Sequence, residues 1–143
     1  MKISAPRAPL TTEAIQALLT AAAARAAELK IKIHICVMDS SAEIVGWLSS
    51  DGAPRIAATT AKWKAITAVN TGMSTADWKA YTASVPEEER KIIDRVGGYL
   101  SADGGVPVIE GGLVLGGIGI SGADQERDED VARYAVRALL EIE

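Results

Sequence analysis

Two glycine-dense segments near the C-terminus constrain the fold of this chain more than any other feature. They run over residues 103–109 (Asp-Gly-Gly-Val-Pro-Val-Ile) and 116–122 (Gly-Gly-Ile-Gly-Ile-Ser-Gly), and each holds a short apolar strand. Glycine lets another backbone or a ligand approach closely, and it tolerates positive φ. We therefore expect these segments to form the rim of a pocket.

The second segment contains a literal G-x-G-x-x-G, from Gly117 to Gly122. A dinucleotide-binding fingerprint also needs a second parallel strand that ends in an acidic residue about 20 residues further on. Only a helix is expected between Glu126 and Glu143. The pattern therefore favours a glycine-rich strand packed closely under a helix over a nucleotide site.

Composition indicates one domain over residues 1–143, with 48% hydrophobic residues to build its core. The balance of 15 basic against 19 acidic residues disfavours nucleic acid as a partner. The single Cys36 excludes an intramolecular disulfide. No segment approaches the ~20 apolar residues of a membrane span, and the N-terminus lacks a signal-peptide core. We expect a cytoplasmic protein that makes no membrane contact.

Hydrophobic periodicity and turn residues predict an α+β fold in the order α-β-β-α-α-α-β-β-α. Strands joined by tight turns pair antiparallel, so two hairpins predict a single antiparallel sheet flanked by helices. The expected elements are a helix over 12–29, strands over 31–38 and 43–49, a helix over 55–70, two short helices within 75–95, strands over 106–110 and 113–120, and a helix over 125–141.

Several short motifs follow one another in order along nearly the whole chain: Val37-Met38-Asp39, Asp51-Gly52-Ala53-Pro54, Lys64-Ala65-x-Thr67-Ala68, Gly104-Gly105-Val106-Pro107-Val108, Gly117-Ile118-Gly119-Ile120-Ser121-Gly122 and Asp128. Taken together, they resemble the GlcG/HbpS-type domain, the haem-degrading or haem-binding domain also found at the C-terminus of PduO-type adenosyltransferases. The resemblance implies a profilin-like sheet, homo-oligomers that include octamers, and haem as a prototype ligand.

His34, the only histidine, is a candidate axial ligand for haem iron. On the first strand it shares a face with Cys36 and Met38, and imidazole, thiolate and thioether are all ligands that iron accepts. The alternative is a hydrogen-bonded strand histidine beside two soft packing residues. The opposite face, from Ile31 to Val37, is expected to be core.

The expected ligand pocket lies between the helical insert and the sheet. Lys64 is positioned to hold a carboxylate or a haem propionate as a point charge, or to form a structural ion pair. Arg55 is a second candidate for an anionic group, and backbone N–H groups at Gly104 and Gly105 suit an anion as well. The full set of candidate lining residues is His34, Arg55, Thr60, Lys64, Tyr99, Gly104 and Gly105.

Two other functions remain open from the residues. The first is a cofactor-free isomerase, lyase or hydratase acting on a small carboxylic acid or carbonyl compound, with Lys64, Asp103 and Tyr99 transferring protons. The second is an accessory subunit of a neighbouring enzyme. The leading hypothesis is a small-ligand-binding protein, with haem or another tetrapyrrole as its ligand.

Overall fold

The computed structural model describes residues 1–5 and 7–142, which form one α+β unit. None of the helices within those residues is both long enough and apolar enough to cross a membrane. The elements are α1 (Thr12–Leu29), β1 (His34–Asp39), β2 (Ile44–Ser49), α2 (Ile56–Thr71), α3 (Thr75–Ser84), α4 (Glu87–Asp94), β3 (Gly105–Glu110), β4 (Leu113–Ser121) and α5 (Gln125–Leu140).

The four strands form one antiparallel sheet in the order β2-β1-β4-β3. Each hairpin pairs within itself, and β1 joins the two hairpins by pairing with β4 from His34↔Ser121 to Asp39↔Gly116. The predicted fold class and element order are confirmed. The long pairing of β1 with β4 makes these two strands the centre of the sheet, with β2 and β3 at its edges.

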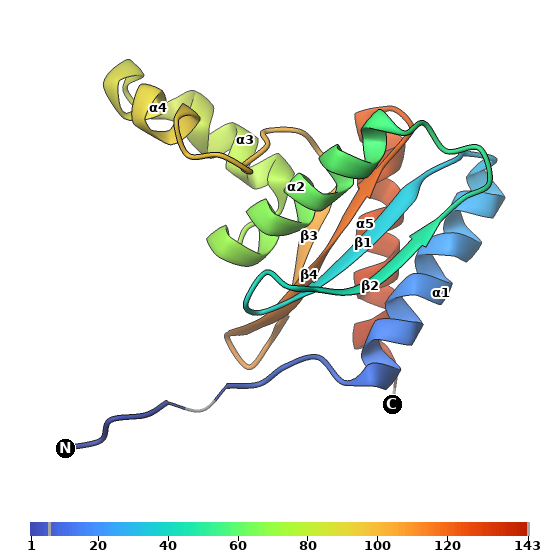
Figure 1. Cartoon of the computed structure of the whole chain (residues 1–143), viewed down its shortest axis with the longest axis horizontal. Helices are drawn as coiled ribbons and strands as arrows, with labels where there is room; N and C mark the ends of the chain where they lie inside the picture. The colour runs from blue at the N-terminus through green and yellow to red at the C-terminus, as the bar shows by residue number, and fades with distance from the viewer. Residues whose placement is uncertain (6, 143) are drawn as a thin grey trace.

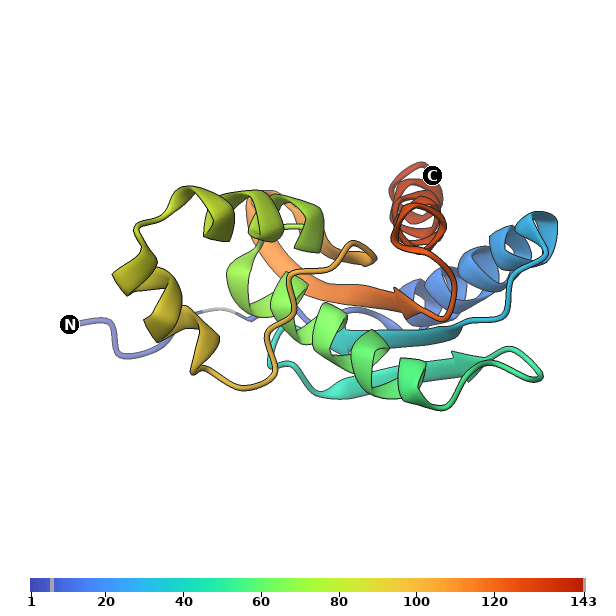
Figure 2. The same ribbon diagram turned by 90° about the horizontal axis from the view of Figure 1, so that it is seen from above.

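Helices cover both faces of the sheet (Figures 1 and 2). α1 and α5 lie side by side on one face, while α2 crosses the other. α3 and α4 extend beyond the edge strand β3 as an arm, and α4 has no buried residue. The main core therefore lies between the sheet and the α1–α5 pair, and a second, smaller core lies under α2.

The first strand begins later than the hydrophobic pattern predicted, at His34 rather than Ile31. The left-handed Lys30 ends α1 with φ 56°, and the backbone N–H of Ile31 still donates to Ala26 O at 3.1 Å. Ile33 N donates to Ser50 Oγ instead of to a strand carbonyl. Residues 31–33 therefore complete the end of the helix and the turn that follows it, although Ile31 and Ile33 are typical of a strand in sequence.

Both faces of β1 are buried. The predicted core face, with Ile33, Ile35 and Val37, packs against α1 and α5. On the other face Cys36 and Met38 are fully buried against Ala61 and neighbouring alanines of α2. Packing is therefore the role of Cys36 and Met38, and only His34 lies near the solvent end of that face.

Glycines of β4 allow α2 to lie directly on the sheet. A Cβ on Gly119 would collide with Ala61 O and would lie 2.6 Å from Ala65 N. A Cβ on Gly105, in β3, would collide with Lys64 O. The glycine-dense segments therefore serve close helix–sheet packing, which is the second of the two interpretations that the sequence allowed.

Candidate functional site

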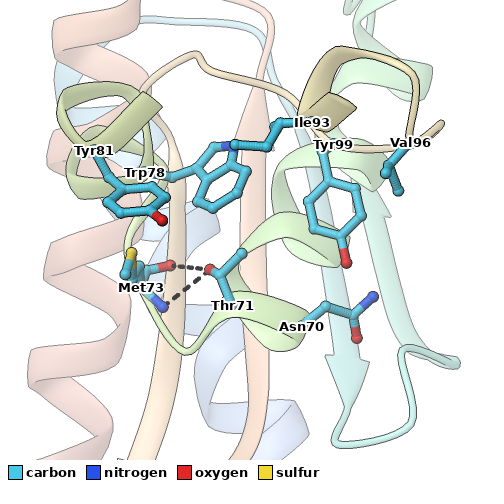
Figure 3. Close-up of a pocket in the computed structure, with 8 residues that line it drawn as sticks. All are labelled: Asn70, Thr71, Met73, Trp78, Tyr81, Ile93, Val96 and Tyr99. Atoms are coloured by element: carbon cyan, nitrogen blue, oxygen red, sulfur yellow. Dashed lines mark hydrogen bonds between the residues drawn. The ribbon is translucent and has the colours of Figure 1, made fainter. Parts of the chain in front are cut away.

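A pocket of about 410 Å³ opens between the end of α2, helix α3 and the segment that follows α4 (Figure 3). Its volume lies in the range of about 300–1,000 Å³ that is usual for small-molecule sites. Apolar surface dominates its wall, with a few polar groups among aromatic rings. The lining residues are Asn70, Thr71, Met73, Trp78, Tyr81, Ile93, Val96 and Tyr99.

Three aromatic rings form one continuous wall of this pocket. Trp78 stacks on Tyr81 with ring centroids 5.6 Å apart and planes at 29°, and it meets Tyr99 at 5.8 Å with planes at 40°. Figure 3 shows the Tyr99 hydroxyl directed toward Asn70 and the Tyr81 hydroxyl on the side of Met73. The wall presents flat apolar surface with polar atoms at its margins, which suits a planar ligand.

Local structure explains how these rings meet. Ser74 caps α3 by accepting a hydrogen bond from Asp77 N at 3.1 Å, so that Trp78 and Tyr81 follow at i, i+3 spacing on one side of the helix. Thr71 Oγ1 accepts from Met73 N at 3.1 Å and holds the turn between α2 and α3. Leu100 N donates to Thr67 Oγ1 at 2.9 Å, which fixes the segment that carries the neighbouring Tyr99 against α2.

Lys64 lies at a different place, in a buried ion pair that links α2 to α5. Its Nζ donates to Asp128 Oδ2 at 3.1 Å and to Ile120 O at 2.8 Å, and both charged side chains are no more than 3% exposed. Asp128 Oδ1 accepts from Ala123 N at 3.0 Å. A Cβ on Gly104 would lie 2.9 Å from Lys64 Nζ, so the lysine occupies the space that a side chain at position 104 would need.

Burial opposes the charge on both members of this pair. Exclusion of water lowers the pKa of Lys64, while the nearby Asp128 carboxylate acts in the opposite direction. The same exclusion of water raises the pKa of Asp128, against the attraction of Lys64 and the hydrogen bond from Ala123. Every polar atom of the pair has a partner within the fold, so this arrangement supports a structural role.

The residues considered for proton transfer are not brought together. Tyr99 lines the aromatic pocket, whereas Lys64 is occupied by Asp128. Asp103 forms an ion pair with Lys79, whose Nζ lies 2.6 Å from its Oδ1. The Asp103 backbone N–H also donates to Gln125 Oε1 at 3.1 Å. Asp103 therefore ties α3 and α5 to the loop before β3.

His34 also makes two hydrogen bonds within the fold. Its Nδ1 lies 2.6 Å from Ser49 Oγ and its Nε2 lies 2.8 Å from Pro54 O. A carbonyl only accepts, so Nε2 carries the proton and Nδ1 accepts from the Ser49 hydroxyl. Ser49 Oγ in turn accepts from Trp47 Nε1 at 2.8 Å. As an iron ligand, His34 would have to give up one of these bonds.

Of the remaining predicted residues, Thr60 and Arg55 lie near the start of α2, and Gly105 lies against Lys64 and Thr75. Thr60 Oγ1 lies 2.6 Å from the hydroxyl of Ser121, the cross-strand partner of His34, and Arg55 is exposed at the N-cap of α2. Gly105 N donates to Thr75 Oγ1 at 2.9 Å, so this N–H group is not free for an anion.

Across residues 1–5 and 7–142, no three His, Cys, Asp or Glu side chains are grouped to hold a metal ion.

Of the pocket residues, only Tyr99 was among the candidate site residues predicted from the sequence. The available signal was the pair Trp78 and Tyr81, because two aromatic residues at i, i+3 spacing form an apolar patch on a short helix whose other residues are small or polar. Nothing local connects this pair with Tyr99, which reaches it only because the chain returns across α2 after α4.

The chain belongs to the family described as haem-degrading protein HbpS-like, whose model matches residues 10–137. This confirms the resemblance seen in the sequence. A curated relative, the corrinoid adenosyltransferase PduO of Citrobacter freundii, is 32% identical over 145 residues. The match covers 97% of this chain and 42% of the relative, so the chain spans less than half of that protein's length.

Solved structures share the fold. A double mutant of HbpS from Streptomyces reticuli is 28% identical, with a TM-score of 0.86 over 95% of this chain and 90% of that one. The crystal structure of a PduOC:haem complex is 24% identical, with a TM-score of 0.82 over 91% of this chain and 94% of that one. These likenesses extend over nearly the entire sheet and its helices.

Proposed function

We propose that this member of the HbpS-like family binds haem or a related tetrapyrrole in the pocket beside α3. The observation that carries the proposal is the wall of three aromatic rings formed by Trp78, Tyr81 and Tyr99. The family description names haem degradation, and a structurally similar protein has been crystallised as a haem complex. Both support a tetrapyrrole as the class of ligand.

The pocket residues fit such a ligand in shape and chemistry. A porphyrin is flat and largely apolar, and aromatic rings pack on such surfaces in offset or tilted arrangements with centroids about 4.5–7 Å apart. Ile93 and Val96 supply apolar surface at the outer side of the pocket. The cavity of about 410 Å³ is open to solvent, so the ligand's polar edge would remain in water.

Three side chains of the pocket carry an atom that haem iron accepts. Tyr81 and Tyr99 offer a phenolic oxygen, and Met73 offers a thioether sulfur. His34, the candidate from sequence, lies outside this set and is held by Ser49 and Pro54. Bound iron would supply the redox chemistry, while the protein would hold the macrocycle and exclude water from one face.

A haem titration followed by absorption tests the proposal. We expect saturable binding at one haem per chain. Trp78→Leu is expected to weaken binding roughly tenfold or more, because it removes the central ring of the wall. Trp63→Leu is the matched control, since Trp63 is partly exposed on α2 outside the pocket. Iron-free protoporphyrin, titrated in parallel, separates ring stacking from iron ligation.

A second set of variants assigns the iron ligand. Tyr81→Phe, Tyr99→Phe and Met73→Leu each remove one candidate atom and keep most of the packing, and Tyr134→Phe is the control on α5. One of the three is expected to shift the Soret band, and His34→Ala is expected to leave it unchanged. Non-saturable binding by the wild type would refute haem binding. A Soret band lost in His34→Ala but kept in Trp78→Leu would refute this pocket as the site.

A further inference from the structure

The edge strand β2 exposes apolar side chains on a surface that no described segment covers. Ile44, Val45, Trp47 and Leu48 are 46%, 38%, 37% and 43% exposed, although all four lie in one six-residue strand. Its neighbour β1 is buried over His34 to Met38. Natural edge strands usually carry lysine or proline that blocks pairing, and β2 has neither.

The backbone of β2 also has groups directed away from the sheet. Ser50 N donates to Ile33 O at 2.8 Å, so the backbone N–H of Ser50 points toward β1. Because the directions of the backbone N–H and C=O groups alternate along a strand, the backbone groups of Leu48 and Gly46 point toward β1 as well. Trp47 and Ser49 therefore direct their N–H and C=O groups outward. The irregularity in the β1–β2 ladder lies before this stretch, so the later half of β2 is a regular edge.

We propose that β2 is the docking surface for a second copy of this chain, which adds its own β2 antiparallel across a two-fold axis. The axis would pass beside Trp47, so that each Trp47 lies opposite the partner's Trp47 in a hydrogen-bonded pair. This pairing uses the outward N–H and C=O groups of Trp47 in both strands and joins the two four-stranded sheets into one of eight strands.

The side chains of this register match one another. Gly46 and Leu48 face α1, because they pair with Val37 and Ile35 of the main core. In the proposed dimer each Leu48 lies opposite the partner's Gly46, so a projecting side chain meets a position that has none. On the other face the two indole rings meet at the axis, and paired aromatic residues are among the favourable cross-strand neighbours.

The residues that pair directly in this register are neutral. No charged residue occurs from Ile44 to Ser50. With the axis at Trp47, Glu43 lies opposite the partner's Asp51 at each end, and these like charges oppose the pairing. The match of apolar side chains and outward backbone groups, and not charge, therefore selects a second copy as the partner.

This interface is independent of the proposed haem site. The aromatic pocket lies beyond the β3 edge, on the side of α3, and β2 is at the opposite edge of the sheet (Figure 1). Pairing through β2 would leave both pockets of the dimer open. A failure of haem binding would therefore say nothing about this surface, and the reverse also holds.

Sedimentation equilibrium on the full chain tests the interface. The wild type is expected to associate in even-numbered units. Trp47→Lys should lower the association constant roughly tenfold or more, because two lysines would face each other at the axis. Val45→Lys is a second variant that breaks no side-chain hydrogen bond. Trp63→Lys is the matched control, because Trp63 is 38% exposed and lies on α2. Circular dichroism verifies that each variant is folded.

Cysteine cross-linking tests the register. Residues in a hydrogen-bonded antiparallel pair have Cα atoms about 5.5 Å apart, which a disulfide spans. Trp47→Cys is expected to form an intermolecular disulfide under mild oxidation, and Leu48→Cys is not. The buried Cys36 serves as an internal control because it is inaccessible. A wild type that remains monomeric, or association unchanged by both Trp47→Lys and Val45→Lys, would overturn the proposal. Equal cross-linking of the two cysteine variants would overturn the register.

Discussion

Replacing Lys64 by methionine should destabilise the protein strongly without any contact to a ligand. Methionine keeps the apolar stem packed against the glycine loop but removes the charge that faces Asp128. The carboxylate then keeps only its hydrogen bond from Ala123 N in a site where both side chains are at most 3% exposed. Breaking one member of a buried ion pair costs about 3–5 kcal/mol of unfolding free energy.

For a chain of this size, that loss corresponds to a fall in Tm of roughly 10–15 °C. Urea titration followed by circular dichroism measures the free energy directly. The double variant Lys64→Met/Asp128→Asn decides the cause, because an asparagine oxygen still accepts from Ala123 N while the buried charge is gone. It should be more stable than Lys64→Met by about 2 kcal/mol or more. Additive losses in the double variant would refute the argument.

The loss of unfolding free energy in Lys64→Met, its stability deficit, should also depend on pH. Burial raises the pKa of Asp128 in the folded state, and removing the lysine takes away the attraction that opposes this rise. A carboxyl group whose folded pKa lies above its unfolded value, about 3.9, costs stability at higher pH and costs nothing once it is protonated in both states. The deficit should therefore narrow as pH falls from 7 toward about 4. A deficit that stayed constant would point to packing as its cause.

Two further predictions concern the face of the sheet under α2. Gly119→Ala should destabilise the protein by about 3 kcal/mol or more in urea titration, because its Cβ would meet the backbone of Ala61. Gly97→Ala, where a Cβ meets nothing within 4 Å, should change stability by less than about 1 kcal/mol, and equal effects would contradict the packing argument. Burial raises the pKa of Cys36 to about 12, so its thiol should not react with a disulfide reagent at pH 8 until urea is added. Rapid reaction of the folded protein would show that α2 opens readily.

Local signals were sufficient to predict most elements of the fold. Thr11 and Asp124 each precede an amphipathic pattern, and each side chain accepts a capping hydrogen bond, from Ala14 N and Arg127 N respectively. Such caps act within one helical turn, so they can be recognised in sequence. The predicted start of β1 was wrong. Ile31 is β-branched and therefore typical of a strand, but its backbone N–H donates to Ala26 O and so belongs to the end of α1.

The candidate site was less accessible to sequence reasoning. Gly104 and Gly105 do lie against Lys64, but the Lys64 side chain and the backbone of α2 occupy the space that the two glycines leave, so no pocket opens there. A glycine that admits a ligand and a glycine that admits a helix look identical in sequence, since both only lack a side chain. The alternative of a structural ion pair for Lys64 was open, but its partner Asp128 was not identifiable.

The sequence by itself determined the order of helices and strands, the antiparallel sheet and the family, because capping, periodicity and turn chemistry act over a few neighbouring residues. Tertiary structure alone decided that Trp78 and Tyr99 share a pocket, that Lys64 meets Asp128, and that β2 is left at an edge. Those relations depend on how α2, α3 and α5 pack on the sheet. They join residues far apart in the chain, and no local pattern records which distant side chain will fill a given space.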